Sequence, residues 1–101
     1  MAEVIWAEPA LNALDEVGDH IAIDDYDAAC NLVRRAFEKI DLLEKNSELG
    51  NVPKELKHTR YRRLVVRPVN IYYRIEEQKV MIVYAERAER DFSMARLVDF
   101  D

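Results

Sequence analysis

Apolar residues recur every three or four positions in two segments of the first half of the chain, which is the spacing of one helix face. They predict helices over about 8–22 and 25–46. Pro9 suits the first turn of the earlier helix, where its missing N–H is not needed, and Asp24-Asp25 supplies an N-cap for the later one. Because so few residues separate the two helices, they should form an antiparallel hairpin. The apolar positions are Ala10, Leu14, Val17 and Ile21, then Ala29, Leu32, Val33, Ala36, Phe37, Ile40 and Leu43.

Alternating or continuous apolar residues mark the strands. A short apolar segment at 4–6 predicts an edge strand, and three strand-like runs follow at 61–67, 69–75 and 80–85. The last run is apolar throughout, so we expect a central strand or one that is covered on both faces. For 86–101 the pattern is compatible with a helical turn followed by a last strand, and it does not decide between structures for this tail.

The order β-α-α-β-β-β, with a helical turn or strand left open at the end, predicts an α+β fold. In this fold a helical hairpin packs on one face of a small antiparallel sheet. The length of 101 residues corresponds to a single domain spanning 1–101.

Composition excludes several classes of protein. No apolar run approaches the ~20 residues that cross a bilayer, and the first twenty residues carry acids where a signal peptide has basic residues, so we expect a cytoplasmic protein without membrane contact. The single cysteine, Cys30, excludes an intrachain disulfide and any multi-cysteine metal site. The two glycines, Gly18 and Gly50, are too far apart for a phosphate-binding loop. We therefore expect no cofactor and no metal.

Charge is distributed unevenly along the chain. Residues 1–50 carry 4 Lys or Arg and 12 Asp or Glu, whereas residues 51–101 carry 11 Lys or Arg and 8 Asp or Glu. The net charge of −5 argues against a general nucleic-acid binder. The arginines of the second half either offset the acidic half by surface pairing or form a basic face toward an acidic partner.

Residues for nucleophilic catalysis are few. Besides Cys30, which lies next to the apolar stripe and is expected to be structural, the hydroxyl nucleophiles are Ser47, Thr59 and Ser93. The imidazoles are His20 and His58, and no metal-binding motif surrounds either. Acyl-transfer and metal-dependent hydrolases are therefore disfavoured.

Arginine and tyrosine are the abundant polar side chains of the predicted strands. Together they can clamp a phosphate and stack on a base, and a metal-free ribonuclease can be built from them if a proton donor and acceptor are supplied. The alternative, which we favour, is that the tyrosines cover the core. They are Tyr61, Tyr72, Tyr73 and Tyr84.

The order and spacing of several segments resemble the RelE/ParE superfamily of bacterial type II toxins, especially the ParE-like branch often called plasmid stabilisation proteins. The resemblance covers about 4–92. It is carried by Trp6-Ala7-Glu8-Pro9-Ala10-Leu11, Leu14-Asp15-Glu16-Val17, Asp24-Asp25, Ala28-Ala29, Tyr61-Arg62-Arg63-Leu64-Val65-Val66, Ile71-Tyr72-Tyr73-Arg74-Ile75, and Val80–Tyr84 running into Glu86-Arg87-Ala88-Glu89-Arg90-Asp91-Phe92.

The resemblance implies a small toxin that is held inactive by a cognate antitoxin encoded beside it. The flexible C-terminal segment of such an antitoxin folds as it binds, so the toxin must offer apolar grooves, here beside the helical hairpin and along the sheet edge. Operator DNA would be contacted only through the antitoxin, and a dimer or a hetero-oligomer with the antitoxin stays open. ParE-like members of the superfamily poison DNA gyrase. RelE-like members cut mRNA on the ribosome with basic sheet residues and a C-terminal aromatic acid or base.

Two departures favour the ParE-like reading, and with it a protein that is not an enzyme. The chain is acidic, and the aromatic residue after Arg90-Asp91 is Phe92, which has no hydroxyl to transfer a proton. Candidates for contact with the target or antitoxin are Arg60, Arg62, Arg74, Arg87 and Arg90. In the alternative, a metal-independent endoribonuclease, Arg62, Arg74 and Arg87 would stabilise the phosphate and His58 or Glu86 would move protons. A second alternative is a non-toxic domain that binds an antitoxin and acts as a co-repressor.

Overall fold

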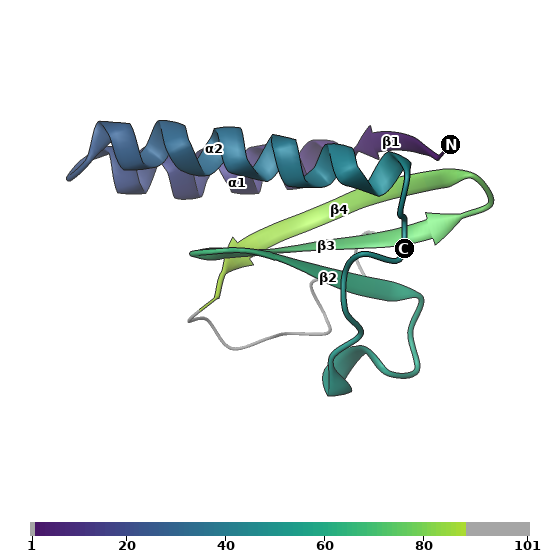
Figure 1. Ribbon diagram of the computed structural model, residues 1–101. Coiled ribbons are helices and arrows are strands. Elements are labelled where there is room, and N and C mark those ends of the chain that lie inside the picture. Colours follow the sequence, from purple (N-terminus) through teal and green to yellow (C-terminus); the bar gives the residue numbers. More distant parts are fainter. Residues whose placement is uncertain (1, 89–101) are drawn as a thin grey trace.

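The computed structural model describes residues 2–88 of the 101-residue chain. Its two helices lie side by side over one face of a four-stranded sheet (Figure 1), which confirms the predicted α+β fold. The elements are β1 (Glu3–Trp6), α1 (Glu8–Ala22), α2 (Tyr26–Asp41), the 3₁₀ turns η1 (Leu42–Glu44) and η2 (Lys54–Leu56), β2 (Tyr61–Val66), β3 (Val69–Glu76) and β4 (Lys79–Arg87). The sequence leaves the structure of residues 86–101 open. In the structure, residues 86 and 87 continue β4, and residues 89–101 lie outside the described residues.

Both helices begin where the sequence predicts them. Pro9 lies in the first turn of α1, and the Asp25 side chain accepts a hydrogen bond of 3.0 Å from the N–H of Ala28 at the start of α2. α2 ends at Asp41, earlier than the predicted end at 46. The helical spacing of apolar residues continues past Asp41 because Leu43 is also a buried core residue. The backbone at Leu43, however, forms a 3₁₀ turn and not an α-helix. No helix within residues 2–88 has the length and the hydropathy of a bilayer-spanning segment.

The strand order is β1-β4-β3-β2, so β1 is an edge strand and β4 is central, as predicted. The pairs β2–β3 and β3–β4 are antiparallel. β1, however, runs parallel to β4, with Glu3 opposite Lys79 and Trp6 opposite Ile82. The sheet is therefore mixed, which corrects the prediction of an antiparallel sheet for this one pair.

The direction of β1 follows from how it is connected. Strands that are joined by tight turns must be antiparallel, whereas a strand that reaches the sheet through a long crossover can pair in parallel. Between β1 and the sheet lies the helical hairpin, which is such a crossover. Alternation of apolar and polar residues shows which residues share a face of a strand, and it carries no information about strand direction.

The main core lies between the helices and the sheet, and a smaller one lies on the opposite face. β4 contributes Ile82 to the first and Val83 to the second, which confirms that it is covered on both faces. A β-bulge between Tyr72 and Tyr73 accompanies this change of face. The main core is formed by Ala10, Leu14, Leu32, Ala36, Ile40, Leu43, Leu64, Val66, Val69, Ile71, Tyr73, Val80, Ile82 and Ala85, and the smaller one by Leu56, Tyr61, Tyr72 and Val83. Three of the four strand tyrosines are thus core residues.

Tyr73 holds the loop that follows α2. Its hydroxyl donates a hydrogen bond of 2.8 Å to the carbonyl of Ser47 and accepts one of 2.8 Å from the N–H of Gly50. Arg62 reinforces the same loop. Its guanidinium donates to the carbonyl of Gly50 at 3.0 and 3.2 Å and to that of Glu48 at 3.1 Å. The loop is therefore fixed to the sheet by two side chains of adjacent strands.

The chain's own groups occupy the outer edge of β2. Asn51 exchanges two backbone hydrogen bonds of 2.8 Å with Arg63, and the hydroxyl of Thr59 accepts the first N–H of the strand at 3.1 Å. Lys39 reaches down from α2 and donates a hydrogen bond of 2.7 Å to the carbonyl of Val65. Strand edges that are occupied in this way resist pairing with other chains.

Candidate functional site

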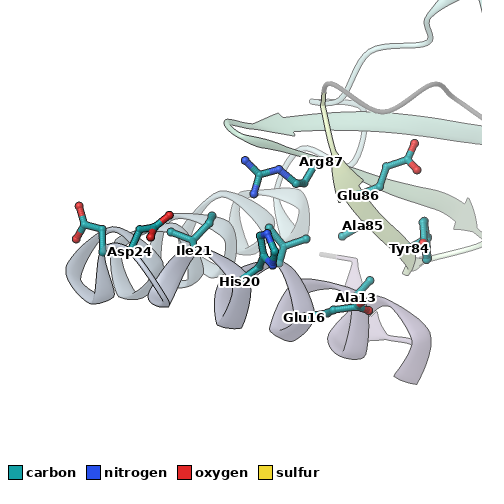
Figure 2. Close-up of a pocket in the computed structure, with 11 residues that line it drawn as sticks. Ala13, Glu16, His20, Ile21, Asp24, Tyr84, Ala85, Glu86 and Arg87 are labelled. Atoms are coloured by element: carbon teal, nitrogen blue, oxygen red, sulfur yellow. The ribbon is translucent and has the colours of Figure 1, made fainter.

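A groove of about 620 Å³ lies between α1 and the second half of β4 (Figure 2). β1 pairs with β4 only as far as Ile82, and α1, which leaves β1 through Ala7, runs past the rest of β4. The groove is lined by residues of α1, of the turn after it and of the end of β4: Ala13, Glu16, Val17, His20, Ile21, Asp24, Asp25, Tyr84, Ala85, Glu86 and Arg87.

The floor of this groove is apolar and its helical rim is acidic. Val17 and Ile21 are half-buried against the main core, and Ala85 is buried in it. Glu16, His20 and Asp24 are exposed along the rim. Figure 2 shows them on the helical side of the groove, with Glu86 and Arg87 on the side of β4. Such a surface suits a partner that presents apolar side chains flanked by charged ones.

A second groove, of about 670 Å³, lies between α2 and β2. It is lined by Arg35, Glu38, Lys39, Leu42, Val65, Val66 and Arg67. Leu42 is 56% exposed. One groove thus lies beside the helical hairpin and the other beside the edge strand β2, and their occupation by an antitoxin segment stays a prediction.

The three arginines of the nuclease hypothesis have three different sets of neighbours. Arg62 donates to carbonyls of the loop after α2. Arg74 donates from Nε to Oε1 of Glu76 at 2.9 Å. Arg87 lines the groove beside α1. Arg62 and Arg74 are therefore each engaged by groups of the chain itself, and these groups differ between the two side chains.

Arg60 and Arg74 meet at one carboxylate. Arg60 Nη1 lies 2.9 Å from the same Oε1 of Glu76, and the Arg60 side chain is 49% exposed whereas that of Arg74 is 12% exposed. Of this pair, Arg60 is the one that presents a large surface to a partner. His58 is exposed in the turn between η2 and β2. Arg90, together with Phe92, lies outside the described residues.

A polar cluster on the face away from the helices contains Arg63, which is not among the predicted site residues. Arg63 lies opposite Tyr72 in the sheet, and the Tyr72 hydroxyl makes a long hydrogen bond of 3.4 Å to Glu86. Arg63 Nε is buried, and no hydrogen-bond partner for it is found among residues 2–88. Strand alternation could have identified Arg63, because it places this residue on the opposite face from Arg62.

Electrostatics define the role of Tyr72 in that cluster. Burial raises the pKa of Tyr72 to about 12, and the neighbouring negative charge of Glu86 adds to the rise, while the positive charge of Arg63 opposes it. Tyr72 therefore keeps its proton at neutral pH and acts as a hydrogen-bond donor, not as a base. General-base catalysis needs a group whose pKa lies near the working pH.

Comparison with known proteins places the chain in a family. The model of the family described as "ParE toxin of type II toxin-antitoxin system, parDE" matches residues 4–92. A protein of Sinorhizobium fredii (strain NBRC 101917 / NGR234), named "Putative toxin Y4kP", is 40% identical over 70 residues, which are 69% of this chain and 72% of that protein.

A solved structure supports the fold. The structure described as "Chromosomal ParDE TA system from P. aeruginosa" superposes with a TM-score of 0.75 at 22% identity and covers 88% of this chain and 98% of that chain. The likeness agrees with the mixed sheet and the helical hairpin described above. From the match over residues 4–92 and the identity to its relative, the chain belongs to the ParE toxin family of type II toxin-antitoxin systems.

Proposed function

We propose that this ParE-family toxin arrests growth by binding DNA gyrase through protein–protein contact, and that a cognate antitoxin encoded beside its gene neutralises it. Both events take place in the cytoplasm, and operator DNA is contacted only through the antitoxin. The observation that carries the proposal is the family match over residues 4–92.

The state of the candidate catalytic residues supports protein contact over mRNA cleavage. Arg62 is engaged by backbone carbonyls and Arg74 by Glu76, so neither offers its full set of donors to a phosphate. Tyr72, which is not one of these candidates but contacts Glu86, keeps its proton at neutral pH, since its pKa is about 12. A net charge of −5 also disfavours binding to ribosomal RNA.

Arg60 is the candidate contact residue that the structure allows to be tested most directly. It is half-exposed and paired with Glu76, and Arg34 on α2 provides a matched control, because it is also exposed and paired with a glutamate, Glu38, at 3.2 Å. Arg→Ala at either site removes the exposed ion pair described above, and such a pair contributes little to stability. The two variants should therefore fold alike and differ only in the surface that they alter.

The test measures growth and gyrase activity. Controlled expression of the chain should stop growth, and expression of the neighbouring gene should relieve the arrest. The purified chain should inhibit supercoiling by gyrase; Arg60→Ala should weaken this inhibition, and Arg34→Ala should leave it unchanged. Unimpaired supercoiling together with codon-position cuts in translated mRNA would contradict the proposal in favour of a nuclease. Normal growth at high expression would indicate a non-toxic antitoxin-binding domain.

A further inference from the structure

The groove between α2 and β2 is basic, although the chain carries a net charge of −5. Three of its lining residues are Arg35, Lys39 and Arg67. Its one acidic lining residue, Glu38, is paired with Arg34 at 3.2 Å. None of the ion pairs found within residues 2–88 involves the three basic side chains. The groove therefore gathers positive charge that the described part of the chain leaves without an acidic partner.

The same groove exposes apolar surface. Leu42 is 56% exposed in its lining, and Val65 is half-buried there. Lys39 donates a hydrogen bond of 2.7 Å to the carbonyl of Val65, so its alkyl chain adds to this surface. A volume of about 670 Å³ has room for a few side chains of one segment.

An acidic protein segment with an apolar side chain fits this lining better than a nucleic acid does. Phosphates would pair with the basic groups, but they gain nothing from contact with Leu42 or Val65. A nucleic acid would also extend beyond the groove, over a molecule of net charge −5, whereas a short segment can be confined to it. Two copies of the chain repel one another for the same reason.

The groove lies on the same edge strand as Arg60, the candidate for target contact tested above. Arg60 directly precedes β2 and Arg67 directly follows it. Seven residues of extended chain at ~3.3 Å each span about 23 Å. This is less than the roughly 30 Å across an interface that buries about 800 Å² on each partner. One partner can therefore contact both ends of β2. The groove beside α1 has an acidic rim, so it suits a segment of different composition.

We propose that the groove between α2 and β2 is a contact site for the target protein. It binds an acidic segment of the target, with an apolar side chain against Leu42 and Val65 and with Asp or Glu residues facing Arg35 and Arg67. The identity of the partner rests on the proposed function, whereas the chemistry of the segment rests on the groove alone. Charge attraction of this kind weakens as salt is added, while the apolar contact persists.

Two double charge reversals test the role of the basic residues. Arg35→Glu/Arg67→Glu alters the groove, and Lys54→Glu/Lys57→Glu alters the turn η2 and its end, which pack on the opposite face of the sheet. Both variants change the net charge by the same amount, so a general electrostatic effect is matched. All four side chains are exposed, so both variants should fold.

The probe is a synthetic amphipathic Leu/Glu peptide, with a Leu/Gln peptide as its uncharged counterpart, and fluorescence anisotropy at low and high salt measures binding. The wild type should bind the Leu/Glu peptide more tightly despite its own negative charge. The groove variant should lose about tenfold or more in affinity and most of the salt dependence, and the η2 variant should lose little. Leu42→Ala should lose about threefold or more at both salt concentrations. Leu49→Ala, which truncates an exposed leucine outside the groove, should lose little.

Supercoiling by purified gyrase connects the groove with the target. The groove variant should need about tenfold or more protein for half-inhibition, and the η2 variant should inhibit like the wild type. Binding of the neighbouring gene's product should be the same for both variants. A wild type that does not inhibit gyrase would refute the proposed function and the identity of the partner, while the peptide measurement would still decide the chemistry of the groove.

Four other results would overturn the proposal. The first is equal affinity of the two charge variants for the Leu/Glu peptide. The second is displacement of this peptide by single-stranded DNA of the same charge at lower concentration, which would assign the groove to nucleic acid. The third is self-association of the wild type in sedimentation that the groove variant lacks, which would assign it to a second copy. The fourth is a groove variant that inhibits gyrase fully but no longer binds the neighbouring gene's product, which would assign it to the antitoxin.

Discussion

The loop after α2 depends on one buried hydroxyl, and Tyr73→Phe removes it. Tyr73 is fully buried, and its oxygen serves both the carbonyl of Ser47 and the N–H of Gly50 at 2.8 Å. Each hydrogen bond contributes about 1 kcal/mol net, and leaving the buried N–H of Gly50 without a partner adds a desolvation cost. We therefore expect the free energy of unfolding to fall by about 2–3 kcal/mol.

Urea unfolding followed by circular dichroism measures this loss, and Tyr26→Phe is the control. Tyr26 is 71% exposed, so removal of the same atom there should change stability by less than about 0.5 kcal/mol. For a domain of this size, the loss at Tyr73 corresponds to a drop in Tm of about 10 °C or more. Hydrogen exchange of the Gly50 amide should also accelerate. If the two variants lost equal stability, the two hydrogen bonds would not anchor the loop.

Three further predictions follow from particular contacts. Gly50→Ala should cost about 2 kcal/mol or more in urea unfolding, because a Cβ there would lie 2.7 Å from the ring of Tyr73; Gly18→Ala, whose nearest contact would be 3.7 Å away, should gain about 0.5–1 kcal/mol. Folding raises the pKa of Tyr72 from 10.0 to about 12, so the unfolded chain releases this proton first and stability should fall as pH rises from 10 to 12. Tyr72→Phe should remove that part of the pH dependence; an unchanged pH profile would refute it. Lys39→Met loses the 2.7 Å bond to a carbonyl of β2, so it should cost about 1 kcal/mol in unfolding and increase self-association in light scattering.

Local patterns in the sequence predict most of the fold because they record which residues face the core. The stripe through Leu14 and the continuous apolar run around Ile82 both correspond to buried faces. The parallel pairing of β1 was not predictable in this way, since Glu3 and Lys79 are distant in sequence and no local pattern links them. The predicted end of α2 at 46 is too late because Leu43 keeps the helical spacing although it lies in a 3₁₀ turn.

The candidate site was harder to predict than the fold. The sequence identifies arginines as candidate contact residues by their residue type. Whether the guanidinium of each can bind a partner depends on the groups of the chain that surround it. Arg62 is engaged by carbonyls of Glu48 and Gly50, and only the folded structure shows this. The acidic rim of the groove likewise depends on β1 ending at Trp6, opposite Ile82, so that α1 comes to lie beside the rest of β4. Charge counts show that the first half is acidic, and they do not show where that charge gathers.

The pairing of β1 with β4 has a consequence for biosynthesis. Ribosomes release a chain from its N-terminus, and contacts between distant parts of a chain form late. Glu3 leaves the ribosome before Lys79, so β1 can pair with β4 only after Lys79 has been synthesised. The two helices of the hairpin can form during synthesis. Their apolar face, however, stays exposed to solvent until β4 has left the ribosome. The complete sheet of this toxin therefore forms only after β4 has left the ribosome.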